Sequence, residues 1–559
     1  MSLTENLSSL PTWALAALAA AVLLCALPVL VLGAPVLACA WALLVVMQIV
    51  APTRLPSALN ESYLLTASAA AATTSIRIAR EAISTARNAA ASHAEAEAAG
   101  AKPIGTNAPL VPPKSQYTLD DIPALDAAGQ YDVLLPALKK LVRQDADQAF
   151  AHPEVKRWLG KRWRNLFLQY AAAEDAAVDT ASQHGVLMQD ARPVAQRLAE
   201  CFLKLPLTTG VAEWQRVAGA APAAAGVTPL PAAPNPLPDL SPQPGSEAAA
   251  PTLLFIPGII TGMLPVREFM PEMKQVQAQC GMRVIRAAVH PLRGAVGNMA
   301  DLLAALEKNV GLGADVADVL PRADEPLPPP PENVIVLAYS KGMTDLLEFL
   351  VAHPEWRARV RAVFSWAGVI GGSPLADNIF GSVRSWPIEK IVSRADEVLE
   401  WICPIVNLRY GQALQRMEEM DIKSAIRDIC VKTRQAWLAE HADELRALNV
   451  PIFCVTASCL ASDCAYFNAS GWYLLNLHDS SNDMQVNERA AKLDTPHSTH
   501  LAVLNANHWD ISFGAFPVAM TLGSRKLKHP FPKKAALSAM VALVHELGLT
   551  SSANTQELG

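Results

Sequence analysis

The stretch VIVLAYSKGMTDLLEFL, residues 334–350, decides the fold of this chain. Val334 to Leu337 is an unbroken apolar run, which predicts a strand buried on both faces. From Met343 onward, apolar residues recur at helical spacing, which predicts a helix. A strand and a helix joined by a sharp turn with Ser340 at its apex are typical of a nucleophile elbow. Such a turn lifts a serine hydroxyl clear of the sheet.

Two small residues near Ser340 support this interpretation. Gly342 permits the helix and the strand to approach closely, whereas Ala338 stands where the pattern usually has glycine. The motif is therefore the variant A-x-S-x-G. The backbone N–H of Lys341 is expected to face the position where an oxyanion would form.

Apolar strands alternate with helical segments over residues 251–550, which predicts a mostly parallel sheet flanked by helices. The other predicted strands are 253–256, 282–285, 361–366 and 451–457. In such sheets, sites form at the carboxyl ends of the strands. The turn Pro257-Gly258-Ile259 leaves the first strand at this edge. A second oxyanion donor is therefore expected from the backbone N–H of Ile259 or Ile260.

A serine nucleophile needs a base, and the base needs a carboxylate that holds its tautomer. In this kind of fold the chain order is serine, acid, histidine. His508 follows an apolar run and lies in a predicted loop, so we expect it to be the base. His497 and His500 belong to a polar segment that predicts a surface position, and His545 lies in the predicted last helix.

Two aspartates are candidates for the acid. Asp463 follows the predicted strand 451–457 more closely. Asp483 lies in a polar turn, 25 residues before His508. Local order alone does not decide between them.

The region 252–515 resembles bacterial lipases and esterases of the α/β-hydrolase superfamily. The matching motifs are Phe255-Ile256-Pro257-Gly258, Ser340-Lys341-Gly342 with Asp345, Gly371-Gly372-Ser373-Pro374-Leu375, Asn482-Asp483 with Val486, and Asn507-His508-Trp509-Asp510. The resemblance implies an α/β-hydrolase fold in which Asp483 is the acid and His508 is the base. The N-terminal half of the chain has no part in it.

Three positions depart from the family pattern. Ala338 and Met484 stand where glycine is common, and Pro257 stands where many members have histidine. Residues 375–450 form an insertion at the place where the superfamily carries its helical cap. An apolar cap over the serine would suit an acyl chain, and an ordinary packed helical subdomain is the alternative.

Residues 13–50 contain no charged residue, a run of 38 positions. One membrane span needs only about 20 residues, and Gly33 and Pro35 interrupt the run. We therefore expect residues 1–52 to be a membrane anchor, as a helical hairpin, a re-entrant segment or one span. Arginines follow the run and none precedes it, which places the C-terminal side in the cytoplasm.

The composition of residues 53–218 predicts an Ala-rich helix followed by a helical region. Within it, residues 156–164 combine five cations with Trp158 and Trp163. This pattern indicates either a patch on anionic lipid or, as we favour, a solvated helix face with two core tryptophans. Residues 219–250 contain eight prolines and predict a linker to the catalytic domain.

Composition excludes several functions. The net charge of −6 and the pI of about 6.1 give no support for nucleic-acid binding. The nine cysteines are odd in number and scattered, which argues against a disulfide framework. Cys454, Cys459 and Cys464 are five apart, unlike the closer pairs of zinc sites, so we expect reduced, buried thiols and no metal.

The sequence thus predicts a membrane-anchored serine hydrolase of lipophilic carboxylic esters. Ser340, Asp483 and His508 would form its triad, and Lys341 and Ile259 its oxyanion hole. Acyl transfer or thioester hydrolysis by the same triad, and an inactive membrane scaffold, are the alternatives. No cofactor is expected; the expected partners are an ester or lipid substrate and membrane lipid. The expected location is a bacterial inner membrane, with the catalytic domain facing the cytoplasm. The sequence makes no prediction of the oligomeric state.

Overall fold

The computed structural model describes residues 110–174, 198–199, 201–204, 237–241, 251–259, 261, 266–311, 329–384, 416–464, 469–514 and 531–550. The predicted anchor, residues 1–52, and the predicted Ala-rich helix lie outside this part of the chain. In the part that is described, no helix is both long enough and apolar enough to cross a lipid bilayer.

Within these ranges, seven strands form one sheet in the order β1-β7-β6-β5-β4-β2-β3. The strands are β1 (Leu203–Lys204), β2 (Thr252–Ile256), β3 (Arg283–Arg286), β4 (Val334–Tyr339), β5 (Val360–Trp366), β6 (Ile452–Ser458) and β7 (Ser498–Asn505). All neighbouring strands are parallel except β1, which is antiparallel to β7. The predicted mostly parallel sheet flanked by helices is confirmed.

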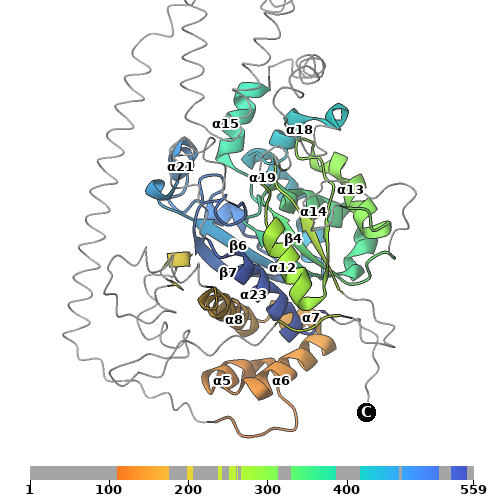
Figure 1. Ribbon diagram of the computed structural model, residues 1–559, viewed down its shortest axis with the longest axis vertical. Helices are drawn as coiled ribbons and strands as arrows, with labels where there is room; N and C mark the ends of the chain where they lie inside the picture. Colours follow the sequence, from red (N-terminus) through yellow and green to blue (C-terminus); the bar gives the residue numbers. More distant parts are fainter. Residues whose placement is uncertain are drawn as a thin grey trace, which may run out of the picture. The chain divides into compact units, whose positions relative to one another are not determined.

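Helices connect the strands and cover both faces of the sheet (Figure 1). Those before β2 are η1 (Leu119–Asp121), α5 (Ile122–Ala127), α6 (Tyr131–Gln144), α7 (Ala146–Ala151) and α8 (Pro153–Ala172). Those between β2 and β6 are α12 (Met270–Cys280), α13 (Ala295–Glu307), α14 (Lys341–Ala352), η2 (Pro354–Arg359), α15 (Pro374–Val383), η3 (Met417–Glu419), α18 (Ile422–Arg427), α19 (Val431–Glu440) and α20 (Ala442–Arg446). Those after β6 are η4 (Ala461–Asp463), α21 (Ala469–Asn476), η5 (Glu488–Ala491) and α23 (Lys533–Glu546).

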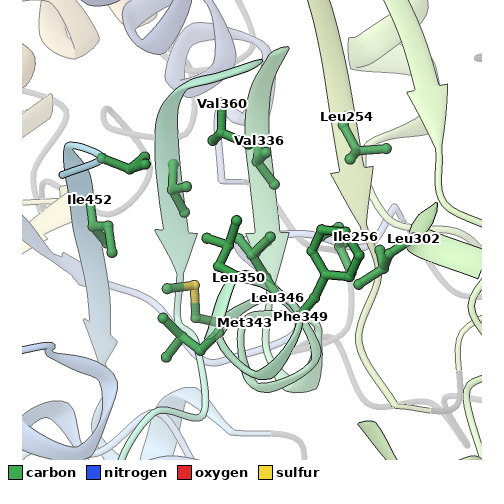
Figure 2. Close-up of a cluster of buried hydrophobic side chains, with 14 of the residues drawn as sticks. Leu254, Ile256, Leu302, Val336, Met343, Leu346, Phe349, Leu350, Val360 and Ile452 are labelled. Carbon is green, nitrogen blue, oxygen red and sulfur yellow. The ribbon is translucent and has the colours of Figure 1, made fainter. Parts of the chain in front are cut away.

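One face of the sheet packs against α13 and α14. Val336 of β4 and Val360 of β5 meet Leu346 and Phe349 of α14 in a buried cluster (Figure 2). Successive residues of a strand point to opposite faces, so the continuous apolar run of β4 supplies both faces at once. This packing fixes the start of α14, where the elbow lies.

The opposite face is aromatic and is covered by α8, α12 and α23. Trp163 of α8 is fully buried, stacked on Phe167 with ring centroids 5.4 Å apart. Its ring also meets Trp366 of β5 edge-on at 6.2 Å. Phe531, just before α23, packs on both Phe167 and Trp366. Figure 1 shows α8 beside α23.

The charged residues of the 156–164 segment have protein partners. The Arg162 side chain donates to Glu546 of α23 at 2.9 Å, and Lys161 Nζ lies 2.5 Å from Asp126 Oδ2. Trp158 of the same segment is buried. The favoured interpretation, a helix with core tryptophans, therefore fits the structure better than a lipid-facing patch.

The sequence predicts that residues 219–250 separate a helical region from the catalytic domain, but in the structure the two parts pack together. Leu203 of β1 pairs with Leu504 of β7, and Arg164 of α8 donates to the Leu501 carbonyl of β7 at 2.8 Å. The described part of residues 53–218 therefore shares the core of the sheet. From the proline-rich segment itself, the Leu240 N–H donates to the Cys280 carbonyl at 2.8 Å. The sequence misses this arrangement because the contacts join segments hundreds of residues apart.

The insertion at 375–450 divides between two roles. α15 and α18 lie side by side and form an apolar cluster that includes Ala376 and Ile426 (Figure 1). In contrast, Leu445 of α20 and the following Leu448 belong to the main core against the sheet. The helices α19 and α20 lead the chain back to β6.

Strand β7 was not predicted, and its position corrects the expectation for His497. That side chain is 7% exposed, and its Nε2 lies 3.2 Å from Asp147 Oδ1. Polar residues at the start of β7 mask the strand pattern in the sequence. The strand exists because residues 498–505 pair along β6 over their whole length.

Candidate active site

Ser340 lies at a strained turn between β4 and α14. Its backbone has φ 54° and ψ −124°, a conformation that costs a non-glycine residue free energy and that persists only where its surroundings enforce it. The Ser340 N–H donates to the Trp366 carbonyl at 3.1 Å. The Ser340 carbonyl accepts from the N–H groups of Met343 at 3.1 Å and Val369 at 3.0 Å. Neighbouring segments therefore hold the turn at three backbone bonds.

Gly342 is required by close packing of backbone on backbone. A Cβ at this position would lie 2.4 Å from the Ile256 carbonyl oxygen and 2.7 Å from that of Pro257. No such constraint demands glycine at 338. Ala338 is an ordinary strand residue of β4, paired with Ile256 and Ser365, so its own backbone needs no positive φ.

Lys341 begins α14, so its backbone N–H has no acceptor within the helix. The side chain turns into the core, where Nζ lies 2.6 Å from Asp345 Oδ1, and both side chains are about 2% exposed. Asp345 Oδ2 accepts from Asn298 Nδ2 at 2.9 Å. The Asp345 carboxylate thus balances the charge of the lysine next to the serine, a buried pair that could not be predicted from the sequence.

His508 and Asp483 meet behind the elbow. The His508 Nδ1 and Asp483 Oδ2 atoms are 2.7 Å apart, and both side chains are 1% exposed. The His508 backbone N–H also donates to the Asp483 carbonyl at 2.9 Å. The loop after β7 and the turn after α21 are thus joined by a backbone bond and a side-chain bond.

The Asp483 turn presents its carboxylate in a fixed direction. Oδ1 accepts from the N–H groups of Gln485 at 3.0 Å and Val486 at 2.7 Å, which leaves Oδ2 for His508. Met484 between them has φ 77°. This left-handed conformation is one that glycine adopts most easily, and Met484 adopts it here.

The Gly371-Gly372-Ser373 motif packs against the turn that carries Asp483. Ser373 Oγ donates to the Gln485 carbonyl and accepts from the Leu375 N–H at 3.2 Å. Gly372 has φ 88°, and a Cβ there would lie 2.4 Å from Val431 Cα. The resemblance gave this motif no role, and in the structure Ser373 supports the turn that carries Asp483.

Tyr339 connects the elbow with the base. Its ring stacks on the His508 imidazole with centroids 5.0 Å apart, and its hydroxyl donates to the His508 carbonyl at 2.9 Å. Burial raises the pKa of Tyr339 well above its usual value, so the phenol stays neutral. Among the residues that the structure describes, the buried His508 Nε2 has no hydrogen-bond partner.

An apolar pocket opens at Ser340. Leu375, Ala376 and Ile379 of α15 form one wall, and Ile426 and Ile429 at α18 form another. Its other lining residues are Ile259, Tyr339, Val369, Ser373, Gln485, Val486, Trp509 and Phe513. A site of this kind favours an apolar group next to the serine hydroxyl.

The remaining candidates lie elsewhere. The Asp463 side chain accepts from the Leu460 N–H at 3.2 Å, at the start of its own short turn. His500 Nε2 lies 3.0 Å from Thr456 Oγ1, and His545 Nδ1 lies 3.5 Å from Thr550 Oγ1. Of the two aspartates left open by local order, Asp483 is the one that contacts His508. Ile260 lies outside the described residues.

A metal site does not emerge from the cysteines. The Cys459 and Cys464 sulfurs are 3.5 Å apart, and this contact together with burial holds the pKa of Cys459 well above its usual value. Across the described ranges, no group of three His, Cys, Asp or Glu side chains could hold a metal ion.

The elbow follows β4, the acid turn follows β6, and the histidine loop follows β7 in a parallel sheet. The chain has the α/β-hydrolase fold. No family model and no curated protein matches the sequence.

Among solved structures, the chain is similar to the metagenomic carboxyl esterase MGS0156, with 20% identity, a TM-score of 0.42, and coverage of 69% of this chain and 91% of that one. It is also similar to the Bacillus licheniformis lipase BlEst2. The mature form gives 18% identity and a TM-score of 0.32, and the match covers 49% of this chain and 89% of the lipase. The propeptide form gives 17% identity and a TM-score of 0.30, and the match covers 49% of each chain.

Proposed function

We propose that this protein hydrolyses carboxylic esters through Ser340, His508 and Asp483. The observation that carries the proposal is the 2.7 Å contact between His508 Nδ1 and Asp483 Oδ2 beside the strained Ser340 elbow. An aspartate on Nδ1 keeps the proton on that nitrogen and leaves Nε2 as the base. Buried Nε2 has no other partner among the described residues, which suits that role.

The reaction proceeds in two steps. Ser340 Oγ attacks the acyl carbon while His508 Nε2 takes the hydroxyl proton, and the proton then goes to the leaving alcohol. Water hydrolyses the acyl-enzyme by the same route in reverse. The backbone N–H groups of Lys341 and Ile259 stabilise the oxyanion, each by about 3 kcal/mol.

The substrate is an ester with an apolar acyl group. Supporting this assignment, the walls formed by α15 and α18 are aliphatic next to the serine. We expect hydrolysis of p-nitrophenyl esters, with kcat/KM rising from acetate to medium-chain acyl groups, since each buried CH₂ contributes about 0.8 kcal/mol. A chain-length series measured at one pH tests this. Absence of hydrolysis for every ester would contradict the proposed function, and a maximum at acetate would contradict the apolar substrate alone.

A membrane location is part of the proposal. Residues 1–52 would anchor the protein in a bacterial inner membrane, with membrane lipid as a partner and the catalytic domain in the cytoplasm. The 38 uncharged positions and the arginines that follow them support this orientation.

Deletion of residues 1–52 is expected to move the protein from the membrane fraction to the supernatant with esterase activity retained. The reason is that the 38-residue uncharged run is the longest apolar stretch of the sequence. Sedimentation in high salt followed by ester assay measures both properties. A truncated protein that still sediments with membranes would show a second anchor. Cleavage of the catalytic domain by protease outside intact cells would contradict the cytoplasmic orientation.

A further inference from the structure

Glu268 is a fully buried carboxyl group between the predicted oxyanion turn and the histidine loop. Its backbone forms an antiparallel bridge with Phe513, and the next residue, Phe269, donates its N–H to the Ser512 carbonyl at 2.9 Å. Glu268 is therefore fixed against the segment that follows His508. The catalytic steps proposed above do not use it.

The Glu268 side chain reaches the turn after β2 through Thr261. Thr261 Oγ1 makes a hydrogen bond with Glu268 Oε1 and lies 2.9 Å from the Gly258 carbonyl oxygen. Gly258 precedes Ile259, the expected oxyanion donor. A Cβ at Gly258 would meet Ser340 Cβ at 3.0 Å, so this turn lies directly against the elbow.

Counting protons decides the state of Glu268. A threonine hydroxyl has one proton, so it can donate to one acceptor only. An ionised Glu268 and the Gly258 carbonyl are both acceptors, and one of them would stay unsatisfied. A protonated Glu268 donates to Thr261 Oγ1, which then donates to the Gly258 carbonyl. The neutral acid completes the chain.

The surroundings of the carboxyl group favour the same state. Burial raises the pKa of Glu268 to about 7, while the hydrogen bond with Thr261, a backbone hydrogen bond and the nearby Arg267 guanidinium each lower it by a smaller amount. The neutral phenol of Tyr339 on β4 is a further ionisable group that interacts with it. Glu268 Oε2 is buried with no partner among the described residues, which is costly for a carboxylate and much less so for a neutral carboxyl group.

We infer that Glu268, as a neutral acid, is a positioning residue that holds the oxyanion turn through Thr261 and the Gly258 carbonyl. The inference rests on the proposed ester hydrolysis. Ionisation of Glu268 removes the donor to Thr261, frees the turn, and misplaces the Ile259 N–H. Activity should therefore fall as the pH rises through the pKa of Glu268, because the active form carries the proton.

Glu268→Gln tests this directly. The glutamine amide can donate to Thr261 as the protonated acid does, but it does not titrate. We expect a bell-shaped pH profile of kcat/KM for the wild type and a plateau at alkaline pH for the variant. From pH 7 to 9 the wild-type kcat should fall at least about tenfold, since one oxyanion donor contributes about 10²–10³ in kcat.

Two further variants separate positioning from a general structural effect. Thr261→Val removes the hydroxyl at nearly constant shape, so kcat should fall about tenfold or more at pH values where Glu268 is protonated, while KM changes little. At alkaline pH, where the wild type has lost the same positioning, the difference in kcat between the two should shrink. Glu307→Gln makes the same chemical change on an exposed glutamate at the end of α13, so it should keep the wild-type pH profile.

Thermal stability gives a readout independent of catalysis. Between pH 4.5 and about 7 the folded protein keeps a proton on Glu268 that the unfolded chain loses, so stability falls as the pH rises across this window. Glu268→Gln lacks this loss. The difference between the Tm of Glu268→Gln and that of the wild type should therefore increase by several degrees from pH 5 to pH 8.

The outcomes are distinguishable. An active wild type whose alkaline limb is equal to that of Glu268→Gln would overturn this inference and leave the proposed function standing. A wild type inactive on every ester would contradict the proposed function, and with it the inference. A Tm difference that is constant with pH would show that Glu268 is ionised throughout.

Discussion

Ser340→Ala is expected to abolish covalent labelling by fluorophosphonate probes and to lower ester turnover by about 10⁶. The hydroxyl is the atom that forms the acyl-enzyme, and no other serine lies at a strained turn with φ near 54° in the described chain. The fold should persist, because the Ser340 backbone bonds to Trp366 and Val369 do not involve the side chain. Labelling, steady-state kinetics and circular dichroism together measure this.

Ser365→Ala is the matched control for this experiment. Ser365 is fully buried inside β5, and its hydroxyl does not line the pocket, so the variant should keep its labelling. If Ser340→Ala kept its labelling and Ser365→Ala lost it, Ser365 would be the nucleophile instead of Ser340. Loss in both, with altered circular dichroism in the second only, would leave Ser340 as the nucleophile.

The elbow could be predicted from the sequence because its determinants are local. The apolar run, the serine and Gly342 lie within nine positions, and each has a single physical reason to be there. The Asp483 turn is also local, because its carboxylate bonds to residues two and three positions later. Local order nevertheless left Asp463 open as the acid, and only the resemblance to the hydrolases selected Asp483.

The supporting contacts could not be predicted because they join distant segments. Ser373 holds the Gln485 carbonyl across 112 positions, and Tyr339 holds the His508 carbonyl across 169. Neither residue type indicates such a contact by itself. The buried pair of Lys341 and Asp345 was missed for another reason. Its i,i+4 spacing is also typical of exposed helix pairs, so spacing alone predicts nothing about burial.

On the aromatic face of the sheet, contacts between distant segments also join parts of the chain that the sequence predicts to be separate domains. Trp163 and Trp366 are separated by the proline-rich segment in sequence, yet their rings are in contact. The composition of residues 219–250 predicts a linker without a core of its own. It could not reveal that the helices before them complete the core of the strands after them.

Asp483→Asn is expected to lower kcat by about 10⁴, by analogy with the serine-protease triad. An asparagine can keep the two bonds from the Gln485 and Val486 N–H groups through its carbonyl oxygen. Its NH₂ group would then face His508 Nδ1, where a carboxylate oxygen lies in the native protein. Nδ1 would have to accept a hydrogen bond, the ring proton would move to Nε2, and the base would be blocked.

Asp463→Asn is the matched control, with the same chemical change 20 positions earlier in the chain. The Asp463 side chain accepts a hydrogen bond from the Leu460 N–H, which an asparagine oxygen can also accept. The loss in kcat should therefore stay within about threefold, the range of a surface change below 0.7 kcal/mol. Both variants should be assayed side by side on one p-nitrophenyl ester, with circular dichroism to establish folding. A larger loss in Asp463→Asn than in Asp483→Asn would reverse the assignment of the acid, while the roles of Ser340 and His508 would stand. The expected difference between the two variants, more than three orders of magnitude, follows from one geometric fact: only Asp483 touches the imidazole nitrogen that must keep its proton.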